Sequence, residues 1–229
     1  MCARYALFGF QQSLLGLFEA DEEWLGSLAD NYNVTPTTVV PVGILEDGHL
    51  KLVPMDWGIV PYWAKDFKSH RPKPVNAKSE TAAALPTFKG CVDRRRCVIP
   101  LSGFFEWSEE ENQDKPYKQP HYITRKDGQL MIAAGLFDTW HRGKEDERTS
   151  ATILTTEPNE FMARHHDRMP CFIAPEDIRA FCSKDVPWEA ARTMCKPLDG
   201  DQLDSWWVTP RMNSVHYLER DTTIPVQSA

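Results

Sequence analysis

Apolar residues along this chain recur mostly in short runs and in alternation with polar residues, as they do in β-strands. Four stretches rich in β-branched and aromatic residues fit this pattern and predict strands: residues 31–45, 48–63, 96–107 and 149–158. Residues 121–140 predict a strand hairpin that turns at Lys126-Asp127-Gly128. Seventeen prolines break the chain into short elements, which favours strands and loops over a helical bundle.

Helical spacing is confined to a few segments. Residues 14–30 are acidic with apolar residues near helical spacing, and they predict a first helix. Residues 79–88 predict a short second helix, whose capping box is imperfect because Glu80 falls too early. Proline and acidic residues open residues 175–183 and 186–195, a helix start signal in both cases. The fold class predicted is α+β, with much antiparallel sheet.

Composition supports a domain that folds by itself. With 229 residues, 41% of them hydrophobic, and eight tryptophans, the chain can bury a substantial core. We expect one domain over residues 1–229, with the last ten or so residues as a flexible tail and exposed loops at residues 110–115 and 141–148. No stretch approaches the roughly 20 apolar residues of a membrane span, and no signal-peptide pattern opens the chain. A cytosolic or nucleoid location is therefore expected.

The net charge of −7 argues against a protein that coats nucleic acid by bulk electrostatics. Any DNA contact must come from a local patch, for which the candidates are Arg4, the basic run from Lys65 to Lys78, the triplet Arg94–Arg96, Arg164 and Arg168. Six cysteines without a C-x-x-C pair or an export signal are expected to be reduced thiols. We expect no structural metal and no cofactor.

Cys2 follows the initiator methionine, and its small side chain permits removal of that methionine. The product is a 1,2-aminothiol, with an amine whose ordinary pKa is about 8 and a thiol whose ordinary pKa is about 8.5. Such a pair can trap an aldehyde, because the amine forms a Schiff base and the sulfur then closes a thiazolidine ring. Taken alone, Cys2 is better explained as a plain residue at a disordered terminus, and the reactive aminothiol needs support from other residues.

Three further motifs carry candidate chemistry. Asn76 offers a donor and an acceptor to a ligand, or it caps a turn. Glu106 lies among aromatic residues on the strand face of Phe104, where desolvation would raise its pKa for proton transfer; the alternative is an edge-strand glutamate facing water. Residues 163–170 contain two histidines and an aspartate, of which one histidine could be held by the carboxylate for acid–base catalysis. Arg168 in the same stretch could bind a phosphate through two hydrogen bonds. The alternative is a plain surface loop.

These pieces, in this order, resemble the SOS response-associated peptidase (SRAP) family, whose members shield abasic sites in single-stranded DNA by covalent crosslinking. The resemblance spans nearly the whole chain and runs through MCARY, YNVTPT, WGIVPYW, NAKSET, CVIPLSGFFEW, MIAAGLFDTW, ILTT, HHDRMP and RMNSVHY. It implies a single SRAP-type domain with a mainly antiparallel, curved or barrel-like sheet and a few short helices. The implied partner is single-stranded DNA that contains abasic sites, bound by a monomer.

The resemblance also implies roles for individual residues. Cys2 would be the crosslinking nucleophile, and Asn76 would hold the Cys2 end or the sugar. Glu106 would shuttle protons during ring opening and Schiff-base formation. His166 would assist ring opening and resolution of the adduct, while His165 falls outside the motif. The peptidase activity in the family name is most simply removal of the protein's own leading residue.

A DNA-binding set follows from the same resemblance: Arg4, Lys78 and Arg168 at backbone phosphates, and Pro36, Trp63, Trp107 and Thr155 in motifs that shape the DNA channel. Aromatic platforms suit unpaired bases because every base has a stackable face. The chain departs from the family pattern at Ala3, where glycine is usual, at Lys78, where arginine is common, and at Met169, where arginine or another polar residue is frequent. We expect crosslinking to be retained with a weaker grip on DNA.

Three other functions compete with this hypothesis. An N-terminal cysteine also opens glutamine amidotransferases, in which the free amine serves as base for the thiol. Cys2 and His166 could instead form a Cys-His thiol protease. A non-covalent module for single-stranded DNA, in which Cys2 is incidental, is the third.

Overall fold

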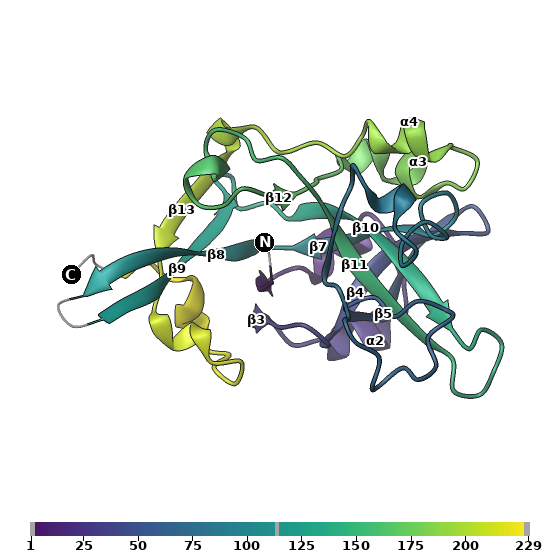
Figure 1. Ribbon diagram of the computed structural model, residues 1–229, viewed down its shortest axis with the longest axis horizontal. Coiled ribbons are helices and arrows are strands. Elements are labelled where there is room, and N and C mark those ends of the chain that lie inside the picture. Colours follow the sequence, from purple (N-terminus) through teal and green to yellow (C-terminus); the bar gives the residue numbers. More distant parts are fainter. Residues whose placement is uncertain (1–2, 113–114, 227–229) are drawn as a thin grey trace.

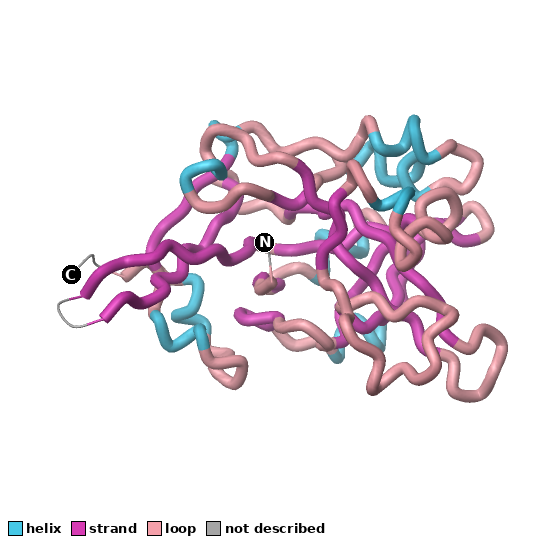
Figure 2. Tube along the Cα trace, in the orientation of Figure 1, coloured by secondary structure: helices cyan, strands magenta, loops and turns pink. Residues whose placement is uncertain are grey.

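The computed structural model describes residues 3–112 and 115–226, and its regular structure is mainly strand, joined by loops and a few short helices (Figure 1, Figure 2). The strands are β1 (Tyr5–Leu7), β2 (Glu19–Ala20), β3 (Asn31–Val34), β4 (Val39–Glu46), β5 (His49–Trp57), β6 (Asn76–Lys78), β7 (Arg96–Leu101), β8 (Gly103–Asn112), β9 (Lys115–Arg125), β10 (Met131–Trp140), β11 (Arg148–Thr156), β12 (Met169–Pro170) and β13 (Leu203–Trp207). The helices are α1 (Gln11–Leu15), α2 (Glu22–Ser27), α3 (Ile178–Cys182) and α4 (Trp188–Arg192). Single 3₁₀ turns are η1 (Ala82–Ala84), η2 (Met162–Arg164), η3 (Pro175–Asp177), η4 (Gly200–Gln202), η5 (Pro210–Asn213) and η6 (Arg220–Thr223).

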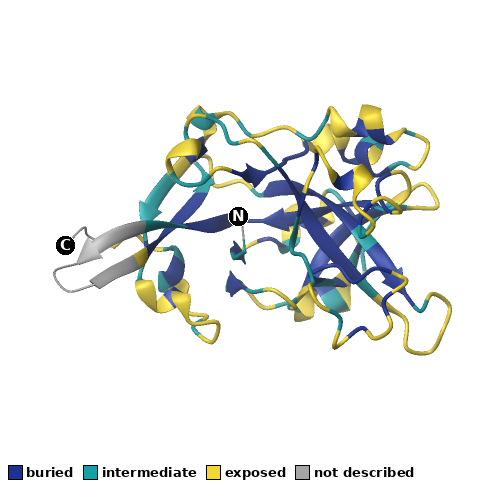
Figure 3. Cartoon of the chain, in the orientation of Figure 1, coloured by how far each residue is buried: buried dark blue, intermediate teal, exposed yellow. Residues whose placement is uncertain are grey.

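A closed barrel forms the core. The larger sheet runs β12-β11-β10-β7-β4-β5-β2, and β11 also pairs in parallel with β5. This extra pairing closes a ring of β4, β5, β11, β10 and β7, which leaves no free edge in the ring. Every residue of β7 is buried, and Figure 3 shows buried residues dominating the barrel strands.

A second sheet, in the order β13-β9-β8-β1-β3, packs against the barrel with all its strands antiparallel. Tyr5 meets Trp57 edge-on with ring centroids 4.9 Å apart, and Phe104 lies 6.4 Å from Phe172. The opposite face of this sheet carries a smaller apolar cluster that includes Phe105. The far ends of β8 and β9 extend away from the barrel (Figure 1).

Alternation along β8 decides which side chains enter the core. Phe104 belongs to the main core cluster and Phe105 to the cluster on the opposite face. Side chains two residues apart share a face of a strand, so Glu106 points the same way as Phe104. It is only 2% exposed, so of the two alternatives that the sequence left open the buried one holds, and the glutamate facing water does not.

The predicted fold class is confirmed, as are most of the strands and the helices near residues 175–183 and 186–195. The prediction of one helix over residues 14–30 is wrong. The chain instead forms two short helices, because Glu19 and Ala20 between them pair with β5. The second helix predicted over residues 79–88 is reduced to the single turn η1.

The hairpin predicted over residues 121–140 is also wrong. A turn does follow Arg125, and Gly128 takes a positive φ of 70°. However, β9 pairs with β8 and β13 in one sheet, whereas β10 pairs with β7 and β11 in the other. The turn therefore passes the chain between sheets. Residues 110–112 and 115, expected in an exposed loop, belong to the paired strands β8 and β9.

The C-terminal stretch packs against the second sheet as far as residue 226. Thr222 donates a hydrogen bond from Oγ1 to the Tyr32 carbonyl at 2.8 Å, and the Val226 amide donates to the Trp207 carbonyl at 2.9 Å. The described part of the expected tail is thus held by β3 and β13. None of the helices in the described residues has the length and apolar character needed to cross a membrane.

Candidate active site

The end of β11 gathers several of the predicted site residues. β5 and β6 lie one after the other along the same edge of β11, so Asn76 pairs with Ile153 and Lys78 with Thr155. On the other edge, β12 pairs with the same end of β11 and places Pro170 beside Thr155. Residues distant in sequence thereby converge around Thr155, which is fully buried.

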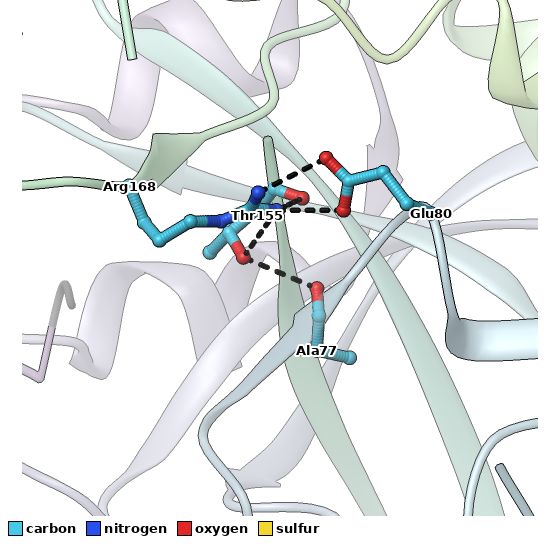
Figure 4. A network of polar contacts seen from close by, with 4 residues as sticks. All are labelled: Ala77, Glu80, Thr155 and Arg168. Carbon is cyan, nitrogen blue, oxygen red and sulfur yellow. Dashed lines mark hydrogen bonds and ion pairs between the residues drawn. The ribbon is translucent and has the colours of Figure 1, made fainter. Parts of the chain in front are cut away.

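Arg168 forms the most extensive polar contacts of this cluster (Figure 4). Its guanidinium donates two hydrogen bonds to the Glu80 carboxylate, at 3.0 and 2.8 Å, and a third to the Thr155 carbonyl at 2.7 Å. Burial alone would raise the pKa of Glu80, but the hydrogen bonds and charge of Arg168 outweigh it and leave that pKa lowered. The guanidinium of Arg168 is engaged with Glu80, and only 8% of Arg168 is exposed. Lys78, by contrast, is exposed at the same end of β11.

Glu106 lies on the second sheet, where β8 and β9 pair. In the strand register it stands opposite His121, so the two side chains share the buried face. Burial raises the pKa of Glu106 to about 7, and the charge of Asp167 adds to the effect. A carboxyl with this pKa exchanges protons readily near neutral pH, as an acid–base group must.

His166 lies in the loop after η2, next to Asp167, whose charge acts on this carboxyl. Its Nδ1 lies 2.7 Å from Asp167 Oδ1 and accepts a hydrogen bond from the Arg168 amide at 3.0 Å. Burial lowers the pKa of His166, against the opposing influence of Asp167. The neutral imidazole is therefore favoured, which is the form that can accept a proton.

Arg4 and Trp107 both form hydrogen bonds with residues of η5. The Arg4 guanidinium donates to Asn33 Oδ1 at 2.7 Å and to the carbonyls of Met212 and Asn213 at 3.1 and 3.2 Å. The Trp107 indole donates to Asn213 Oδ1 at 2.6 Å. Both residues thus anchor η5 as well as standing at predicted DNA positions.

Pro36 and Trp63 lie on exposed connections. Pro36 falls between β3 and β4. Trp63 is 51% exposed in the segment between β5 and β6, and its ring meets His70 edge-on at 5.8 Å. Cys2, the predicted nucleophile, lies outside the described residues, which begin with Ala3 just before β1.

The sequence does not identify Glu80 or His121 as site residues, although each contacts a predicted site residue or its neighbours. Glu80 is visible there only as part of an imperfect capping box, and its position in the NAKSET motif is the one available signal. His121 can be found only through the β8–β9 register, which no local pattern gives. His165 is one of the two adjacent histidines that the sequence offers, but the resemblance assigns the chemistry to His166 because His165 precedes the motif.

A cavity of about 580 Å³ opens beside the His166 loop. It is lined by Glu157, Pro158, Ala163, Arg164, His165, His166 and Asp167. Within residues 3–112 and 115–226, no group of three histidine, cysteine, aspartate or glutamate side chains is arranged to hold a metal ion.

Comparison with known proteins gives a consistent family. The family model described as SOS response associated peptidase (SRAP) matches residues 1–215. Abasic site processing protein YoaM of Bacillus subtilis is 32% identical over 217 residues, covering 93% of each chain. Abasic site processing protein YedK of Escherichia coli is 32% identical and covers 83% of each chain. Abasic site processing protein HMCES of Gallus gallus is 27% identical over 90% of this chain and 69% of its own.

Solved structures match the fold. A crystal structure of a protein from Bacteroides thetaiotaomicron aligns with a TM-score of 0.82 at 20% identity, covering 99% of this chain and all of the other. A protein from Bordetella bronchiseptica aligns with a TM-score of 0.74 at 21% identity, over 91% of this chain. At these identities the likeness establishes the architecture alone.

Proposed function

Because the chain belongs to the SOS response associated peptidase family, we propose that it processes abasic sites in single-stranded DNA. Relatives that carry the name abasic site processing protein align with this chain at about 30% identity. The alignments cover most of this chain and most of each relative. A partner of this kind also fits an acidic protein whose basic residues are local, since few phosphates need be engaged.

The reaction we propose is a covalent crosslink through Cys2 after removal of the initiator methionine. The α-amino group attacks the aldehyde of the ring-opened abasic sugar, and loss of water leaves an imine. The thiolate then adds to the imine carbon, so that the carbon–nitrogen double bond becomes single. Nitrogen takes up a proton as the thiazolidine ring closes. The product shields the lesion as a stable adduct.

Glu106 supplies and removes the protons in this scheme. Ring opening needs an acid for the ring oxygen and a base for the hydroxyl, and imine formation needs an acid for the departing water. The observation that carries the proposal is the buried Glu106, whose pKa of about 7 suits both duties. His166, favoured as the neutral base, assists ring opening and resolution of the adduct.

The remaining predicted residues bind and position. Asn76 holds the sugar or the N-terminal end of the chain from its place beside β11. Lys78 is the exposed cation that meets a phosphate, while Trp63 offers an exposed face for an unpaired base. Arg168 acts on the site through Thr155 and Glu80 as long as its fork remains engaged with them.

The test is incubation of the full chain with single-stranded DNA that carries one abasic site, followed by a denaturing gel. We expect a heat-stable band of protein plus oligonucleotide. It should vanish with Cys2→Ala and when the initiator methionine is retained. Cys195→Ala, which removes another partly exposed thiol, is the matched control and should leave the band unchanged.

Other outcomes select the competing functions. Glutamine hydrolysis without an adduct would support an N-terminal-nucleophile amidotransferase. Binding that survives Cys2→Ala, with no adduct from the native protein, would leave a passive DNA-binding module. Cleavage of unrelated peptides that depends on Cys2 and His166 would support a thiol protease, whereas we expect peptidase activity only at the protein's own terminus.

A further inference from the structure

Two histidines that the proposed chemistry does not use lie in contact beside it. The rings of His121 on β9 and His165 in the loop after η2 have centroids 4.8 Å apart. His165 Nε2 is 3.1 Å from the Ser205 hydroxyl on β13, and His121 Nε2 is 2.9 Å from the Ser108 hydroxyl on β8. Each ring is thus held by a hydroxyl of the second sheet.

This contact joins the two elements that carry the acid–base residues. His121 stands opposite Glu106 in the strand register, and His165 directly precedes His166. Asp167, the residue after His166, also acts on Glu106, because its charge adds to the effect of burial in raising the pKa of that carboxyl. The spacing between Glu106 and the His166 loop therefore depends on how firmly His165 rests on His121.

Other contacts fix the chain on both sides of His165. At its start, Asn159 accepts from the Met162 amide at 2.7 Å and donates to the Leu198 carbonyl at 2.6 Å. At its end, Arg168 binds Glu80 beside the barrel. Between them, His165 links the loop to His121 on β9 and to Ser205 on β13.

We propose that His165, packed on His121 and hydrogen-bonded to Ser205, is a positioning residue that holds His166 in place relative to Glu106. This inference rests on the proposed function of His166. The packing requires that the two imidazoles do not both carry a proton, since two adjacent cations repel. We therefore expect the contact between the His165 and His121 rings to hold at neutral pH and to be lost as the pH falls.

The surroundings of the pair agree with this requirement. Burial lowers the pKa of His165 to about 4, and His121 and Arg164 act in the same direction. Glu106 is the ionisable group opposite His121 on β8. The other rings that meet the pair, Phe161 and Trp207, carry no charge.

Removal of the His165 ring should free the middle of the loop. Because burial is what lowers the pKa of His166, exposure in His165→Ala should raise that pKa towards its ordinary value. Misplacement of a catalytic group by about 1 Å can cost about a hundredfold in rate, so we expect adduct formation at pH 7.5 to slow by roughly tenfold or more. His165→Phe retains an aromatic ring on His121 and should restore the rate to within about threefold.

The experiment uses the full chain and two independent readouts. The first is a titration of the histidine ring protons by NMR, which gives the pKa of His166 without DNA. The second is the rate of adduct formation on abasic single-stranded DNA between pH 4 and 8. The ratio of the His165→Phe rate to the native rate should lie near one at pH 7.5 and rise to about twofold at pH 4, because about half of His165 is then protonated whereas phenylalanine cannot be.

An unchanged pKa of His166 in His165→Ala would overturn the proposal, and so would a ratio that stays constant with pH. If His165→Ala fails to fold, Ser205→Ala keeps both rings and should shift the pKa of His166 in the same direction by less. His49→Ala, at an exposed histidine on β5, is the matched control and should change neither readout. A native protein that forms no adduct would defeat the proposed function, whereas the titration would still decide the positioning role.

Discussion

Two carboxylates of the site, Glu80 and Glu106, differ in every property that matters for their use. Glu80 lies beside the barrel with 38% of its side chain exposed, and it accepts two hydrogen bonds from Arg168. Glu106 lies on the second sheet and is 2% exposed. The pKa of Glu80 is lowered, whereas burial raises the pKa of Glu106 to about 7.

The difference in pKa suits the two carboxylates to different roles, Glu80 to holding the structure and Glu106 to transferring protons. A carboxylate with a lowered pKa stays charged at neutral pH, and it can hold a buried guanidinium but cannot donate a proton. A carboxyl with a pKa near 7 populates both forms, which suits a proton shuttle but makes a poor permanent partner for a cation. The barrel side therefore fixes the end of β11, and the second sheet supplies the titrating group.

The largest expected effect is on chemistry at Glu106. Glu106→Gln keeps the shape of the side chain but removes its titration, so crosslinking should slow by about 10²–10⁴-fold while DNA affinity stays nearly unchanged. The measurement is the single-turnover rate of adduct formation, with affinity from fluorescence anisotropy.

The control for that variant is Glu23→Gln on the exposed face of α2, which should leave the rate unchanged. An unaffected rate in Glu106→Gln would show that Glu106 does not transfer the protons of the reaction.

Stability should depend on pH through Glu106 in the direction unusual for a carboxylate. Its pKa rises from an ordinary 4.5 to about 7 on folding, so the folded state binds the proton more tightly. The stabilisation is present in full below pH 4.5 and is lost as the pH rises through 7, by up to about 3 kcal/mol. Urea unfolding between pH 4.5 and 8 measures it, and Glu106→Gln should abolish this decline.

Glu80 should show the opposite dependence. Its pKa is lowered on folding, so its contribution is present above its ordinary pKa and is lost as the pH falls through the folded value. Glu80→Gln leaves the buried Arg168 without its charged partner and should cost about 1–2 kcal/mol of unfolding free energy, moderated by the partial exposure of the carboxylate. Urea unfolding at pH 7 provides the measurement.

The matched control is Glu46→Gln, which breaks an ion pair of 2.8 Å with Lys51 on the barrel surface. This variant should leave the free energy of unfolding nearly unchanged. Equal costs for both variants would mean that the contact between Glu80 and Arg168 is an ordinary surface pair, and the contrast with Glu106 would weaken.

The smallest effect is expected at Lys78, the exposed cation on the same side as Glu80. Lys78→Ala should weaken binding of single-stranded DNA by roughly tenfold at low salt and reduce the salt slope by about one, with little change in stability. Binding measured across a salt series tests this. Lys144→Ala, in the exposed turn between β10 and β11, should leave the slope unchanged.

Local sequence patterns predict where strands lie better than they predict which strands pair with one another. β7 and β11 are predictable because their apolar runs reflect burial, which each strand experiences wherever it pairs. The turn after Arg125 is visible in the sequence, but no residue near it records that β9 and β10 belong to different sheets. Gly16 offers a hint that residues 14–30 do not continue as one helix.

The site divides in the same way. Burial of Glu106 could be predicted because its own alternation with Phe104 carries the information. The contact of Glu80 with Arg168 could not, since it depends on β6 and β12 meeting the same end of β11. The pairing of His121 with His165 likewise depends on a loop crossing between the sheets.

The parallel pairing of β11 with β5 and β6 also governs when the site can exist. A ribosome completes β11 long after both partners, and parallel neighbours cannot form through a tight local turn. Such distant pairings slow folding, because the entropy of closing long loops is lost before the contacts reward it. Under the proposed function, the N-terminus of a nascent chain is made well before Glu106 and His166, so we expect reactivity towards aldehydes to emerge only after β11 and the loop that carries His166 have been made and have folded.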